Sequence, residues 1–143
     1  MGREERDIAG GYRQGGEGMR QFETGATRDD SESKFDFEGF LSPACLEAYG
    51  EYMHKHRVQA DGALRDSDNW QKGMDKSVYI KSMFRHAMDL WFIHRGILRD
   101  DKKDGHRLTA KEVCCALLFN VFGYLFEDIK LLPQPLDHRG GPQ

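Results

Sequence analysis

Carboxylates at helical spacing are the side chains of this 143-residue sequence that are best suited to chemistry. Glu47 and Glu51 lie four residues apart, so they share one face of a predicted helix. Asp89 and Glu112 lie on the two helices predicted further along the chain. Carboxylates that converge from three helices of a bundle form an oxygen-rich site for Mg²⁺ or Mn²⁺, which also bind phosphate oxygens. The pattern therefore predicts a divalent-cation site that serves phosphate chemistry.

An ionic cluster interrupts the apolar pattern of the second predicted helix. Arg85, His86 and Asp89 are spaced to lie on one face, and almost all of their neighbours are apolar. Charged groups at the edge of a core need ionic partners or a metal. Two interpretations stay open: a metal or substrate site, or an ion pair between Arg85 and Asp89 within the helix with His86 hydrogen-bonded nearby.

Asn120 is the amide within the apolar run "CCALLFNVFGYLF" of the third predicted helix. A buried amide without partners costs about 1 to 3 kcal/mol, so we expect it to meet polar groups on a neighbouring helix. It would act either as a clip between helices or as part of a substrate site. Glu112 also has two interpretations, because Thr109 and Glu112 fit a capping box. Its carboxylate either serves the site or only caps the helix.

Three helices are expected to position these side chains. Helical periodicity and capping signals place them at about residues 43–57, 75–96 and 109–131. Ser42 is the predicted N-cap of the first helix, and Pro43 fits its first position. No segment has a persuasive strand alternation, and we find no internal repeat. The sequence therefore predicts an all-α fold, a small helical bundle.

The third helix is apolar on nearly every side from Val113 to Phe126. In a small domain, such a helix needs a central position in a bundle or burial by a second subunit. We expect both, so the bundle is completed by homo-oligomerisation. A homodimer is the smallest expected assembly, and a homotetramer is the alternative.

The ends of the chain differ from the middle in composition. Half of the 16 glycines lie in the first 40 residues, a Gly-rich arm without helical or strand periodicity. We predict a flexible tail at residues 1–21, a single all-α domain at 22–131, and a second flexible tail at 132–143.

The composition also excludes some functions. A net charge of -3 provides no basic surface for attracting a nucleic-acid polymer. No apolar run reaches the roughly 18 residues of a membrane span, and the N-terminus lacks the apolar core of a signal peptide. We therefore expect a soluble, cytoplasmic protein without a membrane partner. Cys45, Cys114 and Cys115 are expected to be reduced, small core residues.

Several motifs, taken in chain order, resemble a known family. They are "TGATRDDSESKFDF", "LSPACLEAYGEYM", "DNWQKGM", "SMFRHAMDLWFIHRG" and "EVCCALLFNVFGYLFE". Together they look like the dATP/dGTP diphosphohydrolase N-terminal domain, which is grouped with phage and bacterial MazG-like all-α nucleoside triphosphate pyrophosphohydrolases. The resemblance extends from about Phe22 to Glu127. It implies cleavage of a purine deoxynucleoside triphosphate between its α and β phosphates, with divalent-metal help.

The resemblance also implies roles for individual acidic residues. Glu51, Asp89 and Glu112 would be the catalytic residues and the leading metal ligands. Glu47 and His86 would be additional ligands. The MazG-like pattern is Glu-x-x-Glu on one helix and Glu-x-x-Asp on the next, whereas here the first pair has one extra residue and His86 replaces the second Glu. Either the metal ligands have shifted, or catalysis has been lost and nucleotide binding remains.

Cationic and aromatic side chains would bind the substrate. Arg28, Lys72 and Arg85 would hold phosphates. Asn69 and Trp70, in the polar loop "DSDNWQKGM", would line a base pocket in which Trp70 stacks on the purine. In the alternative, Trp70 is a hydrophobic plug and Asn69 shapes the turn. Three functions stay open: a pyrophosphohydrolase, a nucleotide-binding module without turnover, and a helical structural or adaptor protein.

Overall fold

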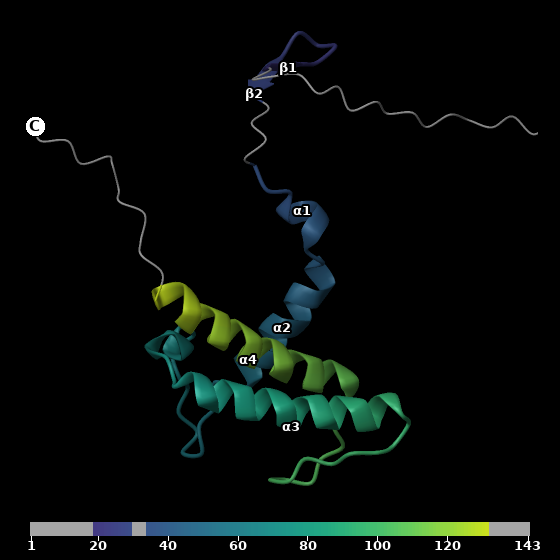
Figure 1. The fold of residues 1–143 in the computed structure, drawn as a ribbon, viewed down its shortest axis with the longest axis vertical. Coiled ribbons are helices and arrows are strands. Elements are labelled where there is room, and N and C mark those ends of the chain that lie inside the picture. Colours follow the sequence, from purple (N-terminus) through teal and green to yellow (C-terminus); the bar gives the residue numbers. More distant parts are fainter. Residues whose placement is uncertain (1–18, 30–33, 132–143) are drawn as a thin grey trace, which may run out of the picture. The chain divides into compact units, whose positions relative to one another are not determined.

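A computed structural model describes residues 19–29 and 34–131 of the chain (Figure 1). The chain divides into two compact units, Met1–Phe40 and Leu41–Gln143. Most of the predicted N-terminal tail and all of the predicted C-terminal tail lie outside the described residues. The domain boundaries predicted from the sequence therefore stay predictions.

The first unit contains a small hairpin. Strand β1 (Met19–Gln21) pairs antiparallel with β2 (Thr27–Asp29). Gly25, with a φ of 84°, occupies the turn, where its N–H donates to the carbonyl of Phe22 over 2.8 Å. A single helical turn, α1 (Phe37–Phe40), follows. No strand was predicted in this stretch, because strands of three residues are too short to display a period-two pattern.

The second unit is helical, which confirms the all-α prediction for this part of the chain. Its elements are α2 (Pro43–Lys55), the short 3₁₀ helix η1 (Asn69–Lys72), α3 (Lys76–His94) and α4 (Ala110–Leu131). The predicted cap of α2 is present, since the Cys45 N–H donates to Ser42 Oγ over 3.4 Å. Asp75 caps α3 by accepting a 2.8 Å hydrogen bond from the Ser77 N–H.

Helix α4 is the element that organises this unit. It lies beside α3 along much of its length and also contacts α2 and η1 (Figure 1). Val113, Cys115 and Ala116 are buried on α4, and Tyr79 is buried on α3, where the centre of its ring lies 6.3 Å from that of Phe119 of α4. A Cβ on Gly123 would lie only 2.2 Å from the Tyr79 ring. Glycine at this position therefore lets the two helices approach closely.

The other side of α4 is not covered in the single chain. A row of apolar side chains there remains 36 to 49% exposed: Leu118, Val121, Phe122, Leu125 and Ile129. Several of them line a cavity of about 490 Å³ together with Leu46, Tyr49 and Met53 of α2, and we call this cavity the apolar groove. The prediction that α4 is buried on most sides is therefore wrong for the chain by itself.

All three cysteines are free, as expected. Only Cys115 is a core residue, whereas Cys45 and Cys114 are exposed, so the core assignment was wrong for these two. None of the helices in the described part of the chain has the length and apolarity needed to cross a membrane.

Candidate metal and nucleotide site

A cavity of about 760 Å³, which we call the carboxylate cavity, contains most of the predicted metal ligands. It lies between the end of α2, the middle of α3, the connector after α3 and the first turns of α4. Its acidic lining residues are Asp89, Asp100, Asp101, Asp104 and Glu112. Its lysine and arginine residues are Lys55, Arg85, Arg99, Lys102 and Lys103. Five negative and five positive side chains therefore surround one space.

Asp89 is held by the connector rather than by its own helix. Its Oδ1 atom accepts hydrogen bonds from Arg99 Nε over 3.0 Å and from Arg99 Nη2 over 2.9 Å. The Arg99 guanidinium also lies 4.4 Å from the centre of the Phe92 ring. Arg85 instead donates to Ser82 Oγ over 2.8 Å. The alternative of an ion pair between Arg85 and Asp89 is therefore wrong, because Arg99 takes the carboxylate.

His86 lines the same cavity and is half-buried. Burial lowers the pKa of His86, and the nearby Asp89 carboxylate opposes this only in part. A lowered pKa favours the neutral imidazole near neutral pH. This is the form that can act as a metal ligand.

Glu112 completes only half of the predicted capping box. Its N–H donates to Thr109 Oγ1 over 3.2 Å, but its carboxylate accepts a 2.8 Å hydrogen bond from His106 Nε2. Burial, and after it the charge of Glu112, raise the pKa of Tyr52 to about 12. Glu112 therefore faces the cavity, where it acts on both the connector and α2.

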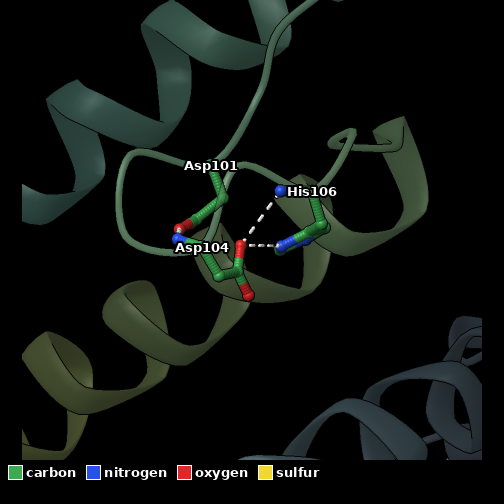
Figure 2. A group of neighbouring side chains, drawn as sticks. All are labelled: Asp101, Asp104 and His106. Carbon is green, nitrogen blue, oxygen red and sulfur yellow. Dashed lines mark hydrogen bonds and ion pairs between the residues drawn. The ribbon is translucent and has the colours of Figure 1, made fainter.

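The connector contributes a cluster that the sequence analysis missed (Figure 2). Metal-ligating atoms of Asp101, Asp104 and His106 all lie within 4.8 Å of one another. The carboxylate of Asp104 accepts from both the N–H and the Nδ1 atom of His106 (Figure 2). Asp104, and then Glu112, raise the pKa of His106, because the protonated ring can donate to both carboxylates. No site was predicted in this charged connector, although its Asp-rich turn followed by His was the available signal.

Two of the predicted acidic ligands lie outside this cavity. Glu51 accepts a 3.1 Å hydrogen bond from Lys111 Nζ, and its side chain is 63% exposed. Glu47 is also exposed. In residues 34–131, the carboxylates of Glu51, Asp89 and Glu112 do not meet within the distance of a shared ion. The predicted three-helix convergence is therefore absent from this conformation, because each carboxylate has a separate cationic partner.

A second cavity of about 760 Å³, which we call the ring cavity, contains the predicted base-binding residues. It lies between the end of α2, the loop after it, η1 and Phe119 of α4. Asn69, Trp70 and Lys72 line it. Trp70 also packs edge-on against Phe126 with 4.8 Å between ring centres. The Trp70 side chain therefore fills apolar space, as in the plug interpretation, and still forms part of the cavity wall.

The two cavities adjoin at the C-terminal end of α2. Tyr52 and His56 line both of them. Their rings lie 4.0 Å apart, and His56 Nδ1 donates to the Tyr52 carbonyl over 2.8 Å. This bond fixes the orientation of the His56 ring in the wall that the cavities share.

Two further residues were predicted to bind the substrate, Arg28 and Asn120. Arg28 is exposed on β2 of the first unit. Asn120 is buried, but its Nδ2 atom donates to the Ala116 carbonyl over 2.8 Å in its own helix. The expected contact with a neighbouring helix was therefore wrong, because the amide bonds to the backbone one turn earlier.

Comparison of the chain with family models, with curated proteins and with solved structures gives no match. The resemblance to the diphosphohydrolase family therefore stays a prediction from the motifs.

Proposed function

We propose that this chain is a divalent-metal-dependent pyrophosphohydrolase that converts a purine deoxynucleoside triphosphate to its monophosphate and pyrophosphate. The observation that carries the proposal is the pair of adjoining cavities with complementary linings. One combines carboxylates with cations, which suits a metal–phosphate group. The other combines aromatic rings with cations, which suits a nucleotide.

The donor set of the carboxylate cavity fits Mg²⁺ or Mn²⁺. Asp101, Asp104 and Glu112 offer hard oxygen ligands, His86 offers an imidazole, and no cysteine is found among the described residues of its lining. Asp101 and Asp104 would hold the ion, with Glu112 or a histidine as a further ligand. When bound, the ion would polarise the phosphoryl oxygens and lower the pKa of a bound water.

The side chains of this cavity would then guide the displacement at the α phosphorus. Asp89 would accept the proton from the attacking water at its carboxylate. The water oxygen would bond to the α phosphorus as the bond to the α–β bridging oxygen breaks, and the leaving pyrophosphate would keep that electron pair. Arg85 and Arg99 would bind the leaving phosphates through charge-assisted hydrogen bonds.

A specific observation favours a second candidate function, nucleotide binding without turnover. The three predicted catalytic carboxylates are each paired with a cation of the same chain: Asp89 with Arg99, Glu112 with His106 and Glu51 with Lys111. These pairs would have to open before all three could share an ion. A chain in which they stay closed would bind a nucleotide without cleaving it.

We further propose that two copies of the chain form the functional unit. The exposed row on α4 places five apolar side chains at helical spacing: Leu118, Val121, Phe122, Leu125 and Ile129. Apolar surfaces of this kind on one helix are typical of interaction sites. A homodimer would cover the row, and a homotetramer remains the larger alternative.

Pyrophosphate release is the experiment that tests the proposed function. The purified chain is incubated with each of the four dNTPs and Mg²⁺ or Mn²⁺, with an EDTA sample as the metal-free control. The proposal expects pyrophosphate from the purine nucleotides only when metal is present. Nucleotides that raise the melting temperature without any pyrophosphate would support the binding module. A bound nucleotide at about 100 times its Kd would add roughly 2.7 kcal/mol of stability, which a melting curve detects. If neither pyrophosphate nor a higher melting temperature is seen, only the structural or adaptor function is left.

A further inference from the structure

The ring cavity carries positive charge that the chain itself does not balance. Arg57, Arg65 and Lys72 line it, and Asp66 is its only carboxylate among the described residues. Within residues 34–131, none of these three cations forms an ion pair with a carboxylate. The cavity therefore has a local excess of positive charge in a chain whose net charge is -3.

The two arginines are positioned by their own backbone. Arg57 Nε donates to the Arg65 carbonyl over 2.7 Å, and the Arg65 N–H donates to the Arg57 carbonyl over 2.9 Å. The isolated bridge between Val58 and Leu64 closes the loop beside them. The two arginines therefore lie at the ends of one closed loop, and the Arg57 guanidinium is held in place, which lowers the entropy it loses when it binds an anion.

Aromatic side chains give the same cavity a stacking surface. Tyr52, Trp70 and Phe119 line it together with Arg57 and Arg65. Charged guanidinium groups bind phosphates strongly, and aromatic rings stack on bases. A ligand that carries both a phosphate and a base would satisfy both features, and the arginines would supply the positive charge that a metal otherwise provides.

We infer that the ring cavity binds a nucleoside monophosphate without metal, with Arg57 and Arg65 on its phosphate. This inference rests on the proposed function, which places the base in the same cavity. It assigns the two reaction products to different cavities: the monophosphate to the ring cavity, and pyrophosphate with its metal to the carboxylate cavity. The monophosphate product therefore competes with the triphosphate substrate.

Fluorescence of Trp70 tests this inference directly. Trp91→Phe leaves Trp70 as the only tryptophan, and Trp91 is 58% exposed, so the fold should tolerate the change. The full chain with this change is titrated in EDTA with dGMP, deoxyguanosine and inorganic phosphate. We expect dGMP to change the fluorescence with a Kd at least about tenfold lower than that of deoxyguanosine or phosphate.

Arg65→Gln is the variant that isolates the phosphate contact. Arg65 is exposed, so circular dichroism should show an unchanged fold. The change should weaken dGMP binding roughly tenfold and leave deoxyguanosine binding as it is. Arg95→Gln is the matched control, because Arg95 is an exposed arginine that lines neither cavity.

Two results would overturn the inference: equal affinity for dGMP and deoxyguanosine, or the same dGMP affinity in the Arg65→Gln variant. Its failure is distinct from failure of the proposed hydrolase. A chain that binds dGMP in EDTA but releases no pyrophosphate from dGTP contradicts the hydrolase alone. A chain that releases pyrophosphate but binds dGMP only with metal contradicts the inference alone.

Discussion

The carboxylate cavity and the ring cavity have the same volume, about 760 Å³, but they balance their charges differently. In the carboxylate cavity, Arg99 pairs with Asp89, and His106 pairs with Asp104 and Glu112. In the ring cavity, the described Arg57 and Arg65 have no carboxylate partner. A ligand of the carboxylate cavity has to offer a positive charge to the carboxylates and a negative charge to the cations, as a metal with its phosphates does. A bare anion is enough for the second.

The wall that separates the two cavities is also informative. Tyr52 lies in this wall, and its pKa of about 12 keeps its hydroxyl protonated at neutral pH. A protonated phenol can donate a hydrogen bond to a phosphate from this wall. The position suits a substrate whose α phosphate lies where the two cavities meet.

The largest effect expected is that of Asp89→Asn, which acts on the carboxylate cavity alone. Removal of the proposed proton acceptor should lower turnover at least about a hundredfold. Binding of dGMP in EDTA and the circular dichroism spectrum should not change. Asp128→Asn is the matched control, because Asp128 pairs with Lys76 over 2.7 Å and lines neither cavity. Full activity of the Asp89 variant would remove this residue from the site.

The next effect concerns the apolar groove, which shares Met53, Trp70 and Phe119 with the ring cavity. Leu125→Glu places a charge in the groove and should convert the proposed dimer to a monomer, because a buried unpaired carboxylate is costly. Light scattering after gel filtration measures the molecular mass. Loss of the dimer should also weaken nucleotide binding at the ring cavity. Leu98→Glu, at a 71% exposed leucine outside the groove, should change neither. A Leu125 variant that keeps the wild-type mass would contradict the proposed interface.

A smaller effect is expected from a change in the packing of α4, the helix that contributes residues to both cavities. Gly123→Ala introduces a methyl group that collides with Tyr79, so the variant should lose about 1 to 3 kcal/mol of unfolding free energy. Urea denaturation measures this loss. Gly50→Ala on α2 is the control, since an added Cβ there meets nothing within 4 Å. This control should be neutral or up to about 1 kcal/mol more stable. Equal stability of the two variants would contradict the close approach of α3 and α4.

The smallest effect expected is that of His106→Gln, and it depends on pH. The folded-state pKa of His106 lies above its ordinary value of about 6.5. The stabilisation from its protonated ring is therefore fully present below about pH 6.5 and is lost as the pH rises through the folded pKa. Thermal unfolding should show the variant to be less stable than the wild type at about pH 6, with a smaller difference at about pH 9. An equal difference at both pH values would mean that the ring is not held as a cation.

Local signals predicted the helices well. Ser42, Pro43 and Asp75 are capping residues whose effect depends on their immediate neighbours, so α2 and α3 begin where expected. The end of α3 was also predicted correctly, because glycine is favoured just after a helix. Gly96 adopts a φ of 74° at this position. The composition of these segments was enough to assign the helical class.

The site was harder to predict, because its pairings join distant parts of the chain. Glu51 pairs with Lys111, 60 residues away, and a helical period carries no information about such a partner. The Asp101, Asp104 and His106 cluster forms through a turn of the connector, which no periodic pattern marks. Asp89 and Glu112 were therefore predicted from the sequence as site residues and do line the cavity, but their cationic partners Arg99 and His106 were not predicted.

Phosphorus NMR of dGTP incubated with the full chain and Mg²⁺ tests the central claim most directly, because it identifies which phosphate bond is broken. The account predicts that the dGTP signals are replaced by those of dGMP and pyrophosphate, and that EDTA prevents the change. Formation of dGDP and orthophosphate, or dGTP signals that persist in the presence of metal, would contradict it.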